Sequence, residues 1–122
     1  MTAQEFFKND RFATNAGVEL IEIKEGYSKA RLVITAEHLN AGGRTQGGAI
    51  FTLADLALAA AANSHGTLAF SLSSNITFLR RTGRCTVCRS TRTLHRPHHR
   101  ILPDRRHQPG GKTDCHFRIQ CI

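Results

Sequence analysis

The chain has 122 residues, enough for one small domain with a modest core, and 40% of them are hydrophobic. Without an apolar run long enough to cross a bilayer, and with a polar start unlike a secretory signal, it is expected to be cytoplasmic. The net charge of +8 is unevenly placed: residues 1–78 carry six Lys/Arg and seven Asp/Glu, whereas residues 79–122 carry eleven and two. We therefore interpret the two parts separately.

The first predicted element is a short amphipathic helix over residues 3–15. Phe6, Phe7 and Phe12 would form its apolar side. Gly17 follows as a plausible stop.

A β-hairpin is predicted next. VELIEIK (18–24) is rich in branched apolar residues, which favour a strand. SKARLVIT (28–35) alternates, with Ala30, Leu32 and Ile34 on one face. A Gly-Tyr pair between the two segments predicts the turn.

A glycine-rich loop over residues 38–48 leads into a predicted helix over residues 49–63, and residues 67–79 predict a long strand. The helix has almost no polar face, so we expect it to be buried on every side. Because it is too short to span a bilayer, the sequence favours a central helix wrapped by a sheet and packed against a second subunit.

Asp55 is the only charged residue of that helix. A carboxylate among apolar residues is costly to desolvate unless it is partnered or functional. Two interpretations are open: an Asp that bonds a neighbouring donor, or a general base or nucleophile.

Gly47 and Gly48 stand at the start of the helix, where backbone N–H groups lack partners and the helix dipole is positive. They form either a tight turn or a backbone oxyanion hole. Asp55 follows Gly47 by eight residues, roughly 12 Å along a helix. A two-fold dimer with antiparallel central helices would bring Asp55 of one subunit near Gly47 of the other, so composite sites are predicted.

The run HLNAGGRTQGGAIFTLADLALAAAANSHG, followed by NITFL, resembles the phenylacetate-degradation (PaaI-like) type of hotdog-fold acyl-CoA thioesterase over about residues 5–79. The resemblance implies an α+β hotdog fold, in which a curved antiparallel sheet wraps a central helix. It also implies dimers or tetramers that hydrolyse an acyl-CoA, with an aromatic or medium-chain acyl group, to free acid and CoA. No metal or organic cofactor is implied.

The same resemblance assigns roles to site residues. Asp55 would activate or orient the attacking water, or attack the carbonyl itself. Gly47 would donate its N–H to the thioester oxygen, Asn40 would position that oxygen, and Ser73 would orient the water. Family members often have His where this chain has Gln46, which can donate a hydrogen bond but cannot carry a proton.

Residues 79–122 depart from the family pattern and contain all four Cys, all three Pro and five of the seven His. One interpretation is a zinc site, in which Cys85-x-x-Cys88 is followed by further candidate ligands: His95, His98, His99, His107, Cys115, His116 and Cys121. Another is a basic nucleic-acid arm, which makes the alternative function a nucleic-acid-binding module with a dimerising N-terminal platform. The third, which we favour, is a shifted reading frame, since a one-base shift can yield strand-like sequence. Non-specific polyanion binding is expected in any case.

Within this second part, CHFRIQCI (115–122) alternates and predicts a fair strand, whereas RCTVCRSTRTL (84–94) predicts a much weaker one. Pro97 and Pro103 would interrupt pairing between them. We therefore expect poor cover over the central helix and an unstable or inactive product.

Overall fold

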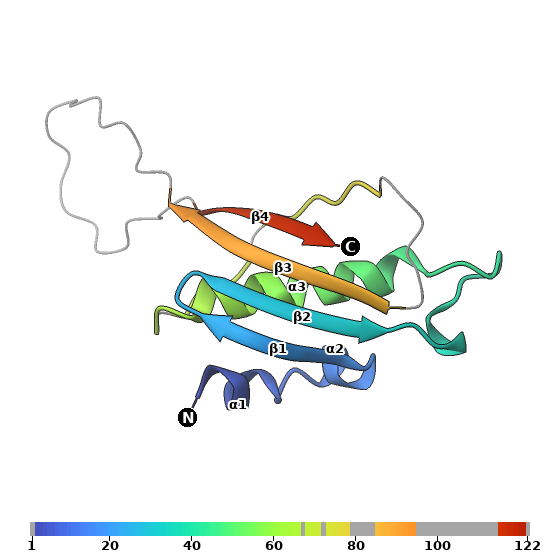
Figure 1. Cartoon of the computed structure of the whole chain (residues 1–122), viewed down its shortest axis with the longest axis horizontal. Coiled ribbons are helices and arrows are strands. Elements are labelled where there is room, and N and C mark those ends of the chain that lie inside the picture. Colours follow the sequence, from blue (N-terminus) through green and yellow to red (C-terminus); the bar gives the residue numbers. More distant parts are fainter. Residues whose placement is uncertain (1, 67, 72, 79–84, 95–114, 122) are drawn as a thin grey trace, which may run out of the picture.

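The computed structural model describes residues 2–66, 68–71, 73–78, 85–94 and 115–121 (Figure 1). Four antiparallel strands form one sheet in the order β1-β2-β3-β4, and α3 lies along one of its faces (Figure 1). This arrangement confirms the predicted α+β class with a central helix against an antiparallel sheet. The elements in chain order are α1 (Ala3–Phe7), α2 (Arg11–Asn15), β1 (Val18–Lys24), β2 (Tyr27–Val33), a 3-10 turn (Ala36–His38), α3 (Gly47–Asn63), β3 (Cys85–Leu94) and β4 (Cys115–Cys121).

The N-terminal segment forms two short helices, so the single helix predicted over residues 3–15 is wrong. The break occurs because Asp10 caps a new helix: its Oδ1 accepts a hydrogen bond of 3.0 Å from the Ala13 N–H. The break also redirects the apolar side chains. Phe7 is buried in the core, whereas Phe12 is 76% exposed.

The hairpin matches its prediction closely. β1 has the predicted bounds, and β2 begins at Tyr27, directly after Gly26 with a φ of +68°. The expected alternation is present, because Ser28, Ala30 and Leu32 face the core and are fully buried. The Ser28 hydroxyl donates to the Ala57 carbonyl oxygen, which ties the hairpin to α3.

Helix α3 begins two residues before the predicted range because Gln46 caps it. Its inner face packs on the sheet. Its outer face, which is predicted to pack against a second subunit, is partly open in the single chain, so burial on every side stays a prediction. Phe51 and Ala59 are half-buried on the outer face, and Asp55 is exposed there. A sheet covers only one side of a helix, so the other side stays open. The buried residues of α3 are Ile50, Leu53, Ala54, Leu56, Ala57, Ala60 and Ala61.

The strand predicted over residues 67–79 is wrong for its described parts, since residues 68–71 and 73–78 contain no strand. Alternation of apolar residues suits a strand, but a strand also needs the N–H and C=O groups of a neighbour. The backbone of Ala69 instead bonds the side chain of Asn63, at the end of α3. Phe70 consequently remains 79% exposed.

The second part of the chain supplies two strands of the sheet. β3 pairs with β2 from Tyr27↔Thr91 to Val33↔Cys85, so the expectation of a much weaker strand there is wrong. β4 confirms the strand expected in CHFRIQCI. Pairing uses backbone groups, which β2 offers along its whole edge whatever the side chains. Because α3 contacts all four strands, its inner face is not poorly covered.

The three interpretations of this part stay predictions. Cys88 of β3 stands opposite Cys121 of β4 in the strand register. The candidate zinc ligands at positions 95, 98, 99 and 107 lie outside the described residues. The same is true of residues 79–84 and 95–114 as a whole, which form part of the segment that the shifted-frame hypothesis concerns. No helix within the described ranges is long and apolar enough to cross a membrane.

Candidate active site

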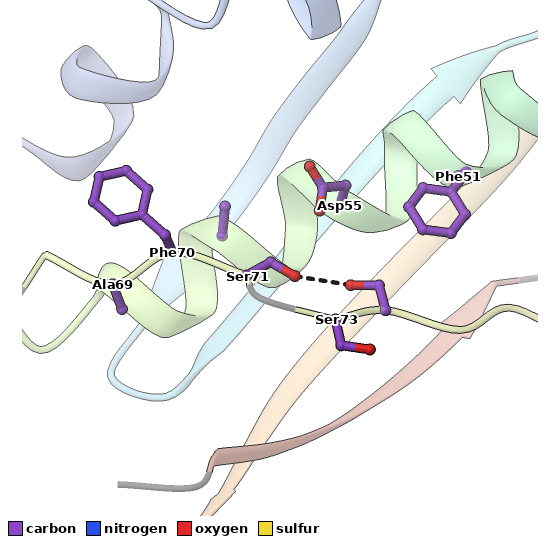
Figure 2. Close-up of a pocket in the computed structure, with 8 residues that line it drawn as sticks. Phe51, Asp55, Ala69, Phe70, Ser71 and Ser73 are labelled. Atoms are coloured by element: carbon purple, nitrogen blue, oxygen red, sulfur yellow. Dashed lines mark hydrogen bonds between the residues drawn. The ribbon is translucent and has the colours of Figure 1, made fainter. Parts of the chain in front are cut away.

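A pocket of about 430 Å³ opens between the outer face of α3 and the segment that follows the helix. Figure 2 shows Phe51 and Asp55 on the helix, with Ser71 and Ser73 on the segment that runs beside it. The structure therefore brings together two of the predicted site residues, Asp55 and Ser73. The complete lining is Phe51, Asp55, Ala59, Ala69, Phe70, Ser71, Ser73 and Ser74.

Asp55 lies in the middle of α3, flanked one helical turn away on each side by Phe51 and Ala59. Partial burial of its carboxyl raises the pKa, and the negative charge of Asp10 raises it further. Within the described part of the chain, the carboxylate accepts no hydrogen bond and forms no ion pair. This favours the functional interpretation over an Asp that merely bonds a neighbouring donor.

Gln46 and the two glycines after it form the start of α3. The Gln46 Oε1 accepts hydrogen bonds from the N–H groups of Gly48 and Ala49, the latter at 3.2 Å. A Cβ on Gly48 would lie 2.6 Å from that oxygen, so a side chain at this position would require the Gln46 side chain to shift. A Cβ on Gly47 would lie 3.1 Å from the ring of Phe78. Among the described residues, nothing accepts the N–H of Gly47, which leaves it available to a ligand.

Asn40 organises the loop before the helix. Its Oδ1 accepts from the N–H groups of Gly42 at 2.9 Å and Arg44 at 3.1 Å. The His38 ring fixes the loop from the other side: Nε2 donates to the Ala16 carbonyl at 2.7 Å, which leaves Nδ1 to accept from the Thr35 N–H. The side-chain NH₂ of Asn40 bonds nothing in the described regions and can face a ligand.

The predicted site residues thus form two groups. Asn40, Gln46 and Gly47 gather at the N-terminal end of α3, whereas Asp55 and Ser73 line the same pocket near its middle. None of the first group lines the Asp55 pocket. Two turns of helix, roughly 12 Å, separate the groups, so one carbonyl group cannot contact both within one chain.

Several pocket residues were missed from the sequence. The spacing of Phe51, four positions before Asp55, could have identified it as a neighbour on the same helix face. Ser71 and Ser74, whose hydroxyls are 2.8 Å apart, gave no such signal because their position depends on the path of an irregular segment. The proximity of Asp10 to Asp55 is likewise a consequence of the tertiary fold.

Comparisons with known proteins agree with this fold. A profile of the thioesterase superfamily matches residues 42–100. The acyl-coenzyme A thioesterase PaaI of Escherichia coli is 37% identical over 78 residues, which are 64% of this chain and 56% of that protein. A putative esterase of Archaeoglobus fulgidus is 46% identical over 74 residues, 61% of this chain and 48% of that protein. The solved structure of the E. coli PaaI protein from the phenylacetic acid degradation operon superposes with a TM-score of 0.72 at 30% identity, covering 79% of this chain and 71% of that one.

The fold and the carboxylate on its central helix therefore define a hotdog-type α+β protein. The chain belongs to the thioesterase superfamily, and within it to the PaaI-like type. It spans about half the length of the curated relatives that it matches. The superfamily match runs beyond Leu79 to residue 100, and so includes β3.

Proposed function

We propose that the protein hydrolyses an acyl-CoA thioester to a free acid and CoA. The observation that carries the proposal is the Asp55 carboxylate, which lies without a protein partner among the described residues in a pocket on the outer face of the central helix. Family membership supports the same reaction class, and the E. coli relative is named an acyl-coenzyme A thioesterase.

Asp55 would act in one of two ways. As a general base, its carboxylate takes a proton from water while the water oxygen attacks the thioester carbonyl. As a nucleophile, it attacks the carbonyl itself and forms a mixed anhydride, which water then cleaves. In both routes the C–S bond breaks, and the CoA thiolate leaves and takes up a proton. The raised pKa of Asp55 makes its carboxylate a stronger base, and Ser73, which lines the same pocket, would orient the water.

The developing oxyanion needs hydrogen-bond donors held in a fixed position. We assign this role to the Gly47 N–H, supported by the side-chain NH₂ groups of Asn40 and Gln46, at the positive end of the α3 dipole. Because these donors lie two helical turns from Asp55, they would come from a second copy in a homodimer or homotetramer. The half-open outer face of α3 suits such packing.

The acyl group is proposed to be aromatic or medium-chain. Phe51 and Phe70 provide apolar surface on the two walls of the pocket, and a volume of about 430 Å³ admits a phenyl ring or a chain of moderate length. The phenylacetic acid operon named for the E. coli structure points to the same chemistry. The comparisons lend no support to the alternative nucleic-acid-binding function.

Asp55→Asn tests the proposal, because it keeps the size of the side chain and removes its basicity. We expect kcat on an acyl-CoA panel, including phenylacetyl-CoA, to fall by about 10²- to 10⁴-fold. Glu37→Gln makes the same chemical change at an exposed acid outside the pocket and should retain full turnover. Full turnover by Asp55→Asn would remove Asp55 from the mechanism.

Thermal unfolding shows whether the variant is intact. The pKa of Asp55 is higher in the folded state than the ordinary 3.8, so ionisation destabilises the fold as pH rises through that raised pKa. Asp55→Asn should therefore unfold at a higher temperature than wild type at neutral pH. The two should converge below the ordinary pKa, where both forms are uncharged. A lower melting temperature at neutral pH would mean that the lost activity reflects damage to the fold.

A further inference from the structure

Asn63, the last residue of α3, joins the helix to the segment that follows it. Its Nδ2 donates to the Ala59 carbonyl at 2.9 Å and to the Ala69 carbonyl at 3.0 Å, and its Oδ1 accepts from the Ala69 N–H at 2.8 Å. One amide therefore bonds both backbone groups of Ala69. The chain reverses to make this possible at Gly66, whose φ of +77° favours glycine.

Both residues that Asn63 holds line the Asp55 pocket, Ala59 on the helix and Ala69 on the opposite wall. Asn63 itself stands two helical turns after Asp55, on the same face of α3. The described residues 68–71 and 73–78 form no strand pairing. The two hydrogen bonds between the Asn63 side chain and the Ala69 backbone replace the bonds that a neighbouring strand would make here. The position of the serines relative to Asp55 then depends on this side chain.

We propose that Asn63 is a positioning residue, which fixes the serine-bearing wall of the pocket at the distance from Asp55 that hydrolysis needs. Ser71, Ser73 and Ser74 follow Ala69 within a few residues, so a shift at Ala69 moves all three. The catalytic part of this inference rests on the proposed function. The part that concerns the wall does not, because it follows from the hydrogen bonds alone.

The chemistry of the amide provides a discriminating variant. Asn63→Asp has the same shape but replaces the Nδ2 donor with an oxygen that faces the carbonyl oxygens of Ala59 and Ala69. Two of the three hydrogen bonds are lost and become repulsive contacts, whereas the acceptor for the Ala69 N–H remains. Asn63→Ala removes all three.

The neighbouring Ser64 is a matched control at the same helix end. Its Oγ accepts from the Gly26 N–H at 2.7 Å and donates to the Ala61 carbonyl at 2.8 Å, so it fastens the β1–β2 turn rather than the pocket wall. Ser64→Ala removes hydrogen bonds near the C-terminus of α3 without touching a residue that lines the pocket.

Two measurements on the full-length protein test the proposal. Amide hydrogen exchange of the peptide that contains Ala69 should accelerate more than about tenfold in Asn63→Ala, which removes the acceptor for the Ala69 N–H, and less in Asn63→Asp, which keeps that acceptor. It should not accelerate in Ser64→Ala. Steady-state kinetics with the best acyl-CoA of the panel should show kcat reduced by up to about a hundredfold in both Asn63 variants, with KM changed little, because misplaced groups penalise the chemical step. Ser64→Ala should keep both constants close to wild type.

Unchanged exchange at Ala69 in both Asn63 variants would overturn the inference. So would equal losses of kcat in Asn63→Asp and Ser64→Ala, since that result reports general loosening of the helix end. If Asp55→Asn kept full turnover while the Asn63 variants accelerated exchange, the proposed function would fail and the structural role of Asn63 would stand.

Discussion

Asp55 ionises in surroundings that come from three parts of the chain: its own helix, the segment after the helix and Asp10 at the start of α2. Burial contributes most to its raised pKa, and the charge of Asp10 adds to it. Since only the carboxylate form can act as base or nucleophile, activity should be lost as pH falls through this raised pKa. The acid limb of the kcat/KM profile should therefore lie above the ordinary value of 3.8.

Asp10→Asn offers a test of this coupling. The Asn side-chain oxygen can still accept from the Ala13 N–H, so the cap of α2 is retained while the negative charge is lost. The acid limb should move to lower pH, because the charge that disfavours ionisation of Asp55 is gone. The profile should be compared with that of Glu37→Gln, which removes an exposed carboxylate elsewhere. An acid limb unmoved by Asp10→Asn, or moved equally by both variants, would contradict the coupling.

For single residues, the sequence identified the chemically important side chain but did not identify the distant residues that surround it. Asp55 stood out because a lone carboxylate in an apolar helix is expensive to desolvate. Its neighbours Phe51 and Ala59 lie on the same helix, so their spacing of four residues on either side of Asp55 is enough to predict them. Asp10 and Ser73 meet Asp55 only through the tertiary fold, and Ser73 entered the site prediction through the family resemblance.

Among the elements, α3 is capped at its start by Gln46, and this cap accounts for the glycine at position 48. The Gln46 Oε1 accepts from the N–H groups of Gly48 and Ala49, and a Cβ at position 48 would lie 2.6 Å from that oxygen. Gly48→Ala should lose the cap, at a cost of up to about 1 kcal/mol, which the better helix propensity of alanine partly offsets. Chemical denaturation measures this difference.

A double-mutant cycle makes the prediction specific. In a Gln46→Ala background the cap is already absent, so Gly48→Ala has no hydrogen bond to break and gains the better helix propensity of alanine. The same substitution should then be neutral or stabilising. An equal cost of Gly48→Ala in both backgrounds would show that the collision with Gln46 is not its cause.

The elements also show where patterns succeed. Branched apolar residues predicted β1, and alternation predicted β2 well, because Ser28, Ala30 and Leu32 of β2 all face the core. The same kind of pattern failed for residues 67–79, where the described part bonds Asn63 instead of a strand. It also underestimated Cys85–Leu94, because the edge of β2 supplies pairing groups that do not depend on side-chain pattern.

For the whole molecule, the separation of Asp55 from Gly47 makes the composite site testable. Gly47→Pro deletes the proposed donor, yet proline is favoured at the first helical position. Gln46 before it has φ −67° and ψ 133°, which proline accepts in its predecessor. The half-exposed Phe78 side chain can rotate to make room for the proline ring.

Asp55→Asn and Gly47→Pro should each be inactive alone, and mixed subunits should recover about a quarter of wild-type activity. Half of a random mixture is heterodimer, and each heterodimer has one intact site of two. Activity is measured after the two variants are co-expressed and purified together. A site contained within one chain would give no recovery, since every subunit carries a defect.

The sequence by itself determined which segments alternate, which helix is apolar and which residue in it carries a charge, because these properties follow from local side-chain chemistry and period. It also located the glycines at the start of that helix. The tertiary structure alone decided which face of α3 stays open, that residues 85–94 extend the sheet, and that Asn63 rather than a strand holds the wall opposite Asp55. These outcomes depend on backbone groups, which are the same for nearly every residue and acquire partners only when distant segments meet.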